Sequence, residues 1–243
     1  MKRAKIHLTD CVKVFDPYVK IYKEILKDRL CIINLLFFLC LLFSFCQDSG
    51  FASSLENSGL EKMESKIYLV PVGDIEKSIL ESLAKELEKT FGCVAEIHKR
   101  KSLPQETYSE RRRQYSSSQI LQKIHSFIEA KKQDKVLAVA RVDLYVERLN
   151  FVFGEAELGG HFGIISLARL RQSFYGLSEN KALFMGRAVK EAVHELGHVY
   201  GLEHCPDSRC VMHFSNSLMD TDRKRASFCA RCRQTLEKIN LRH

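Results

Sequence analysis

The chain has 243 residues, of which 45% are hydrophobic and 28% are charged, a composition that excludes an intrinsically disordered protein and predicts one sizeable globular domain with an appendage. Its formal net charge of +8 is divided between both ends, since residues 1–29 and residues 206–243 each carry eight basic and four acidic side chains. Such a dispersed excess is typical of a solvated surface, so we do not expect nucleic acid as a partner. The nine cysteines are not arranged as in a disulfide-stapled secreted domain, because three lie in one apolar run and four crowd the C-terminal end.

The N-terminal segment, residues 1–62, combines a basic start, a hydrophobic stretch and a polar linker. Residues 30–46 carry no charge and are almost long enough to span a membrane, and the basic residues before them favour a cytoplasmic N-terminus. We therefore predict a membrane anchor or signal there, and a membrane-anchored or exported protein. Three alternatives stay open: cleavage near residues 50–52, a buried core helix, and translation that begins at Met63 and leaves the protein in the cytoplasm.

Residues 63–243 alternate strand and helix patterns, so we predict one α/β domain. Apolar β-branched runs predict strands at residues 66–72, 93–98, 135–142, 150–153 and 162–167, the last as an edge strand. Apolar positions with a 3.6-residue period predict three helices. The first runs from a cap at Asp74 to Phe91, and the third runs from a cap at Ser178 into His194. The second runs from Ser118 to Lys131, and its inward side chains are Ile120, Leu121, Ile124, Phe127 and Ile128. Residues 100–116 and 154–161 are predicted loops.

The third helix ends in HELGHVYGLEH, at residues 194–204. His194 and His198 are four residues apart, so they lie on one helix face and can bind a single zinc ion. Gly201 takes left-handed backbone angles at little cost, so the helix can stop and the chain can bring His204 to the same metal. Three protein ligands leave one position open, which is typical of a catalytic zinc site.

Glu195 lies about 100° around the helix from His194, where it can flank the metal without binding it. It is the predicted general base for a zinc-activated water, so we predict a zinc-dependent peptidase. Two alternatives stay open. An aminopeptidase would need an acidic group that holds a free amine, for which Glu155 and Glu157 are candidates. A non-catalytic, zinc-stabilised binding module would have no use for a base beside its metal.

Four cysteines follow the histidines in two short pairs. Four thiolates predict a second, closed tetrahedral zinc site, which would be structural. Two disulfides or four free thiols are the alternatives, and export would favour the disulfides. We therefore predict two Zn²⁺ ions, the catalytic one on His194, His198 and His204, and the structural one on Cys205, Cys210, Cys229 and Cys232.

The whole pattern, from the histidine motif through Cys205, Cys210-x-Met212 and Cys229-x-x-Cys232, resembles the archaemetzincin branch of the metzincin zinc peptidases. The KIYLVPVG stretch from Lys66 and the LNFVFG and SLARL stretches are also similar to that family. The resemblance covers roughly residues 66–240, the pattern-bearing part of the chain.

The resemblance implies a metzincin-like mixed, twisted sheet with an antiparallel edge strand over the cleft, helices packed on the sheet, and a Cys-rich C-terminal subdomain. It also implies that Met212 lies in a turn beneath the metal, although a methionine at that spacing can equally be core filler. Residues 1–62 have no counterpart in the family core. We expect a monomer that acts on peptides or proteins, and neither the motif nor the resemblance indicates the natural substrate.

Overall fold

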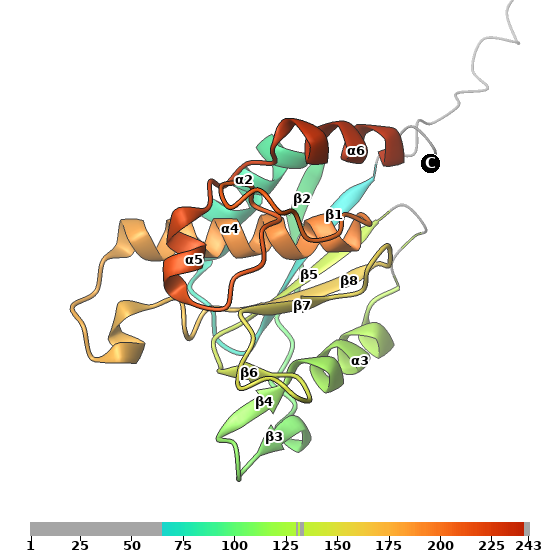
Figure 1. Ribbon diagram of the computed structural model, residues 1–243. Coiled ribbons are helices and arrows are strands. Elements are labelled where there is room, and N and C mark those ends of the chain that lie inside the picture. Colours follow the sequence, from blue (N-terminus) through green and yellow to red (C-terminus); the bar gives the residue numbers. More distant parts are fainter. Residues whose placement is uncertain (1–64, 130, 132–133, 241–243) are drawn as a thin grey trace, which may run out of the picture. The chain divides into compact units, whose positions relative to one another are not determined.

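The computed structural model describes residues 65–129, 131 and 134–240 (Figure 1). The core of this part is a five-stranded sheet with the strand order β2-β1-β5-β8-β7 and with helices on both faces. The predicted membrane-targeting segment, residues 30–46, lies outside the described residues. Within the described ranges, no helix is both long and apolar enough to cross a membrane.

Four neighbouring strands of this sheet are parallel and one edge strand is antiparallel. The parallel strands β1, β5 and β8 are nearly continuous apolar runs because helices bury both of their faces. The mixed sheet and its antiparallel edge confirm the predicted fold class. The strands are β2 (Val94–Ile97), β1 (Lys66–Val72), β5 (Lys135–Ala140), β8 (Phe162–Ser166) and β7 (Gly154–Ala156).

Helices α2 (Lys77–Phe91) and α4 (Lys181–Val199) pack on one face of the sheet, and α3 (Ser117–Phe127) packs on the other (Figure 1). The side chains of β1 alternate between these layers: Ile67 and Leu69 belong to the core under α2 and α4, whereas Val70 belongs to the core under α3. The C-terminal helices α5 (Leu218–Arg223) and α6 (Ala230–Asn240) lie on the α4 side. The sheet therefore carries α4 as a buried, firmly supported helix.

The edge of the sheet differs from the prediction. Strand β8 lies between β5 and β7, so residues 162–167 are internal and the edge strand is β7, inside the predicted loop 154–161. Of the predicted strand 150–153, Val152 makes a single bridge, to Leu144. The strand was predicted because residues 151–153 are apolar. In the structure these apolar side chains line a cleft, and the residues do not belong to the main sheet.

The predicted loop 100–116 is also more ordered than expected. It contains the 3₁₀ turn η1 (Gln105–Thr107) and the strands β3 (Tyr108–Ser109) and β4 (Gln114–Ser116), which form a second small sheet with β6 (Leu144–Tyr145). The buried amide of Gln114 explains this, because it donates hydrogen bonds to Asp143 and to the carbonyl of Asn150. Because the segment is polar and basic, its sequence gave no indication that Gln114 would be buried.

Helix ends were predicted less well than helix interiors. The N-cap of α2 is Glu76 rather than Asp74, and the N-cap of α4 is Asn180 rather than Ser178, with the Asn180 side chain accepting from Leu183 N at 2.9 Å. Helix α3 ends at Phe127, before the predicted Lys131, so the Phe127 side chain is 57% exposed instead of inward. Helix α2 ends at Phe91, as predicted, and Gly92 follows it in the left-handed region.

Candidate metal centres and active-site cleft

Three histidines converge where α4 ends. Helix α4 continues through Val199, and Gly201 with φ of 93° turns the chain back, while Leu202 N donates to Gly197 O at 2.8 Å. This turn brings His204 opposite the helix. One side-chain nitrogen from each of His194, His198 and His204 lies within 4.8 Å of the others. The structure therefore brings the three predicted zinc ligands together.

The hydrogen bonds of two rings prepare them for a cation. Nδ1 of His194 lies 2.8 Å from Val211 O, and Nδ1 of His198 lies 2.7 Å from Leu202 O. A carbonyl oxygen can only accept, so each Nδ1 carries the hydrogen and each Nε2 presents a lone pair. Burial lowers the pKa of both rings, and that of His194 well below its usual range, which keeps them neutral.

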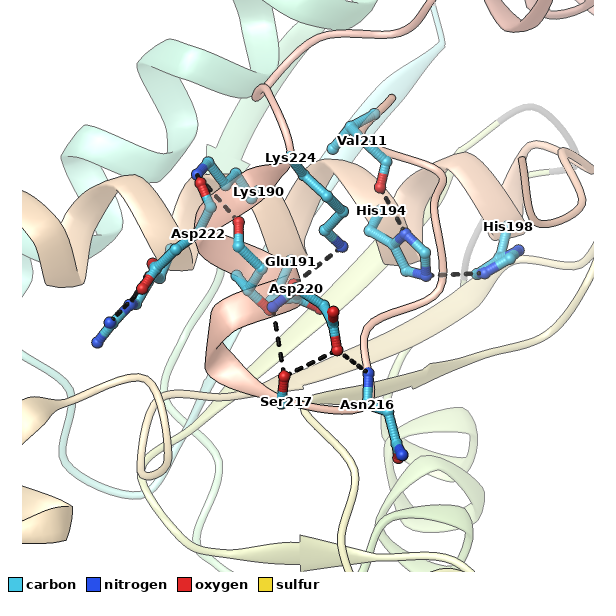
Figure 2. Close-up of polar contacts among 12 residues, drawn as sticks. Lys190, Glu191, His194, His198, Val211, Asn216, Ser217, Asp220, Asp222 and Lys224 are labelled. Atoms are coloured by element: carbon cyan, nitrogen blue, oxygen red, sulfur yellow. Dashed lines mark hydrogen bonds and ion pairs between the residues drawn. The ribbon is translucent and has the colours of Figure 1, made fainter. Parts of the chain in front are cut away.

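The spacing of these lone pairs fits a metal ion. The two Nε2 atoms of His194 and His198 lie 3.1 Å apart (Figure 2). Two lone pairs facing each other at that distance repel, whereas a tetrahedral zinc about 2.0–2.1 Å from each nitrogen would separate them by roughly 3.3 Å. The two Nε2 atoms are therefore suitably placed to bind one zinc ion, and the His204 ring can supply the third ligand.

Glu195 is buried beside these rings and lines the same cleft. Burial, reinforced by the neighbouring Glu191, raises the pKa of its carboxyl well above the usual range. Strand β7 approaches it closely: a Cβ built at Gly154 would lie 2.5 Å from Glu195 Oε1. Glycine at the start of the edge strand thus leaves the space that the carboxylate occupies.

The cleft has a volume of about 360 Å³ and runs between β7 and the segment 214–216. The histidines and Glu195 lie on its floor. Its other lining is largely apolar, and comes from Val146, Leu149, Phe151, Val152, Phe153 and Phe214. Such a groove suits an extended chain with apolar side chains.

Met212 packs against α4 at Gly197, between His194 and His198, a position compatible with the turn beneath the metal that the family resemblance implied. It is fully buried, and a Cβ at Gly197 would come closer than 3.0 Å to its sulfur. Its carbonyl accepts from Cys205 N at 2.8 Å, and His213 Nδ1 lies 2.8 Å from Cys205 O. His213 thus holds the backbone next to His204, and it is not one of the three clustered rings.

Of the two acidic candidates for an amine anchor, Glu155 lines the cleft that holds the histidines, whereas Glu157 does not. Glu155 accepts from the hydroxyls of Ser117 and Ser118, at the start of α3. Glu157 pairs with His125 on the same helix. Both carboxylates are therefore engaged by residues of α3, and among the described residues neither belongs to the histidine cluster.

The four C-terminal cysteines form a second cluster. The sulfurs of Cys205, Cys210, Cys229 and Cys232 lie within 4.8 Å of one another, and none of the four forms a disulfide bond. The Cys205 and Cys229 sulfurs are 3.8 Å apart, too far for a disulfide of about 2.05 Å. A tetrahedral zinc with bonds of about 2.3 Å would place its sulfurs roughly 3.8 Å apart.

The surroundings of this cluster favour thiolates. Cys229 N donates to Cys210 Sγ at 3.3 Å, and the Arg231 guanidinium donates to Cys205 Sγ at 3.5 Å. The backbone N–H of Cys232 is the main cause that lowers the pKa of Cys229 to about 7. Burial raises the pKa of Cys210, so these thiols do not all ionise readily unless a cation offsets the accumulated charge.

Sequence reasoning missed Gly154 and the buried pair of Glu191 with Lys224. The closeness of Gly154 to Glu195 depends on which strand forms the sheet edge, and no local pattern encodes that. A lysine in a basic C-terminal segment reads as a surface residue. Glu191 precedes His194 by three residues, so helix periodicity could have placed it on the same face.

A family model described as Peptidase family M54 matches residues 64–238. The chain is 46% identical to the archaemetzincin of Methanocaldococcus jannaschii over 175 residues, which cover 72% of this chain and 94% of that protein. It is 41% identical to the archaemetzincin of Pyrococcus furiosus over 183 residues, with coverage of 72% and 94%.

Solved structures are similar as well. The crystal structure of archaemetzincin from Methanopyrus kandleri superposes with a TM-score of 0.66 at 36% identity, over 75% of this chain and 98% of that one. The archaemetzincin of Archaeoglobus fulgidus, crystallised with malonate, gives a TM-score of 0.61 at 40% identity, over 70% and 98% of the two chains. The likeness thus spans the α/β part that carries both clusters.

Proposed function

Since the chain belongs to the archaemetzincins, Peptidase family M54, and is a zinc metallopeptidase, we propose that it hydrolyses peptide bonds on the three-histidine site with Glu195 as the general base. The observation that carries this proposal is the buried Glu195 carboxylate in the same cleft as the three histidines. A zinc ion held by His194, His198 and His204 supplies Lewis-acid chemistry, which acidifies water and polarises a carbonyl.

In the proposed reaction, Glu195 accepts and then donates the transferred proton. Its carboxylate accepts a proton from the water whose oxygen attacks the scissile carbonyl carbon, and then donates it to the amine nitrogen as the C–N bond breaks. Among the described residues, no hydrogen bond engages this carboxylate, so it is available for both transfers. Its raised pKa favours a group that can hold the proton between the two steps.

The substrate peptide lies along β7. This strand is the outer member of the main sheet, so its outward N–H and C=O groups can pair with an extended peptide. The apolar lining of the cleft then receives the peptide's side chains. The contacts of Glu155 and Glu157 with residues of α3 give no support to their role as amine anchors in an aminopeptidase.

The four cysteines hold a second, structural zinc. Four protein sulfurs leave no open position on a tetrahedral ion, so this site does not take part in hydrolysis. It ties α6 to the segment that carries His204, because Cys205 follows that histidine directly and Cys232 belongs to α6. The spacing of the sulfurs and the contact with Arg231 support this proposal.

The test is hydrolysis of a mixed peptide library by the purified, zinc-loaded protein and by Glu195→Gln. The amide keeps the shape of the side chain but cannot accept the proton, so we expect a loss of at least about 10²-fold in kcat with zinc content unchanged. Glu203→Gln is the matched control, because Glu203 belongs to the same motif and is exposed. Full activity in Glu195→Gln would overturn the assignment of the base.

A further inference from the structure

One ion pair next to the active site has no part in the proposed chemistry. Lys224 Nζ lies 3.2 Å from Glu191 Oε1, and the two side chains are 0% and 3% exposed. The hydroxyl of Thr221 donates to the same oxygen at 3.1 Å. Removing two charges from water is costly, and an apolar pair of similar size would often be at least as stable. The position of the pair therefore calls for an explanation other than stability.

The pair connects the floor of the cleft to its wall. Glu191 is on α4, one turn before His194, and it lines the cleft. Lys224 directly follows α5, and the wall of the cleft, residues 214–216, directly precedes it (Figure 2). The backbone between Met212 and Lys224 thus leaves the histidine cluster, forms the wall and returns to α4 at Glu191.

The wall and α5 behave as one unit because hydrogen bonds join them. Asn216 N donates to Asp220 Oδ2 at 3.2 Å, and the Ser217 hydroxyl donates to the same oxygen at 2.8 Å (Figure 2). Ser217 also caps α5. Whatever fixes α5 on α4 therefore fixes the wall as well.

Two further links hold α5 on α4, but they lie farther from the histidines. Arg187 forms a bidentate pair with Asp222, at 2.7 and 2.6 Å, and Lys190 Nζ donates to the carbonyls of Thr221 and Asp222. Arg187 and Lys190 do not line the cleft, whereas Glu191 does. The Glu191 pair is therefore the link that sets the distance between wall and floor at the site itself.

We propose that Glu191 and Lys224 are positioning residues, whose buried ion pair holds the wall 214–216 at the spacing from β7 that an extended peptide requires. The inference rests on the proposed function, since it concerns peptide binding in the same cleft. A chain bound along β7 has the wall on its other side. An ion pair resists the separation of α5 from α4 more sharply with distance and direction than apolar packing does.

The test replaces the pair by apolar residues in the double variant Glu191→Leu/Lys224→Met. This change avoids an unpaired buried charge, so we expect the thermal midpoint to stay within a few degrees of the wild type and the zinc content to stay unchanged. The wall then loses its directional anchor. We expect KM for a cleaved library peptide to rise about tenfold with kcat changed by less than about threefold.

A second readout does not depend on activity. Hydrogen exchange of the backbone amides in residues 213–223 should become about tenfold faster in the double variant, because the segment opens more often. Ile120→Ala is the matched control, since Ile120 is fully buried under α3 on the opposite face of the sheet. Ile120→Ala lowers the free energy of unfolding without altering a contact of the wall. We therefore expect KM and the exchange rate of the amides in residues 213–223 to stay as in the wild type.

Unchanged KM together with unchanged exchange in the double variant would overturn the proposal, and so would a fall in kcat alone. If this double variant does not fold, Glu191→Gln/Lys224→Met serves instead, because it leaves no unpaired buried charge and keeps a polar partner for Thr221, and the same two readouts apply. A wild-type protein without peptidase activity would contradict the proposed function, while the exchange measurement would still decide whether the pair holds the wall.

Discussion

Gly197 is the residue that lets Met212 lie directly against the active-site helix. It belongs to α4 between the two helical histidines, and a Cβ there would come closer than 3.0 Å to Met212 Sδ. The Met212 turn also carries Val211, whose carbonyl orients His194. A single side-chain atom at Gly197 would therefore disturb the metal site from below.

We predict that Gly197→Ala lowers the free energy of unfolding by about 1–3 kcal/mol through overpacking and reduces zinc binding at the histidines. Denaturant unfolding and a zinc titration measure the two effects. Gly186→Ala is the control on the same helix, because its Cβ would meet nothing within 4 Å. That variant should gain about 0.5–1 kcal/mol, since alanine is the better helix former. Equal stability of the two variants would contradict the packing account.

Gly154 has the corresponding role above the site. A methyl group there would lie 2.5 Å from the Glu195 carboxylate, so either the carboxylate or β7 must move. We predict that Gly154→Ala lowers kcat about 10²-fold, because a displacement of about 1 Å in a catalytic group has that effect. The thermal midpoint should change little. Ala156→Gly, on the same strand, should keep most of the activity, and a Gly154→Ala enzyme of wild-type kcat would show that the close approach has no catalytic consequence.

The sequence predicted which side chains come together in the two clusters, because their relationships are local. Helix periodicity places His194 and His198 on one face, and the glycine turn returns His204 within a few residues. The same holds for the two cysteine pairs. Gly154 and Lys224 escaped prediction because their roles depend on contacts with residues 41 and 33 positions away, Glu195 and Glu191.

Helix α4 is the element on which the site is built, and its start lies far from the chemistry. Asn180 caps it with a 2.9 Å hydrogen bond from Leu183 N. We predict that Asn180→Ala destabilises the fold by about 1 kcal/mol, which lowers the thermal midpoint by roughly 2–4 °C, and leaves kcat/KM unchanged. Ser178→Ala should leave the midpoint unchanged, because Ser178 lies outside the cap. If Ser178→Ala lowered the thermal midpoint more than Asn180→Ala, Ser178 rather than Asn180 would be the N-cap of α4, as the sequence had indicated.

At the scale of elements, interiors of strands and helices were predictable and their neighbours in the sheet were not. The apolar run of β8 reads the same whether the strand is internal or at an edge, so the edge was assigned to residues 162–167 rather than to β7. Strand β7 is only Gly154–Ala156, too short for a period to be visible. The small sheet of β3, β4 and β6 escaped for the same reason.

At the scale of the whole molecule, the two candidate metal centres share one stretch of backbone. His204 belongs to one and Cys205 to the other. Both backbone polar groups of Cys205 are hydrogen-bonded, since its N–H donates to Met212 O and its carbonyl accepts from His213. The sheet supports α4, α4 carries two of the histidines, and the cysteine cluster begins at the residue that follows the third.

The central claim is that a zinc ion binds to three histidines beside Glu195 and that a second one binds to four cysteines. Diffraction data from crystals of the purified protein, collected just above and just below the zinc absorption edge, test it directly. We predict two anomalous peaks, one about 2.0–2.1 Å from a nitrogen of each of His194, His198 and His204 with a non-protein fourth ligand, and one about 2.3 Å from four sulfurs. A protein whose histidine cluster carries no peak after zinc loading would contradict the account.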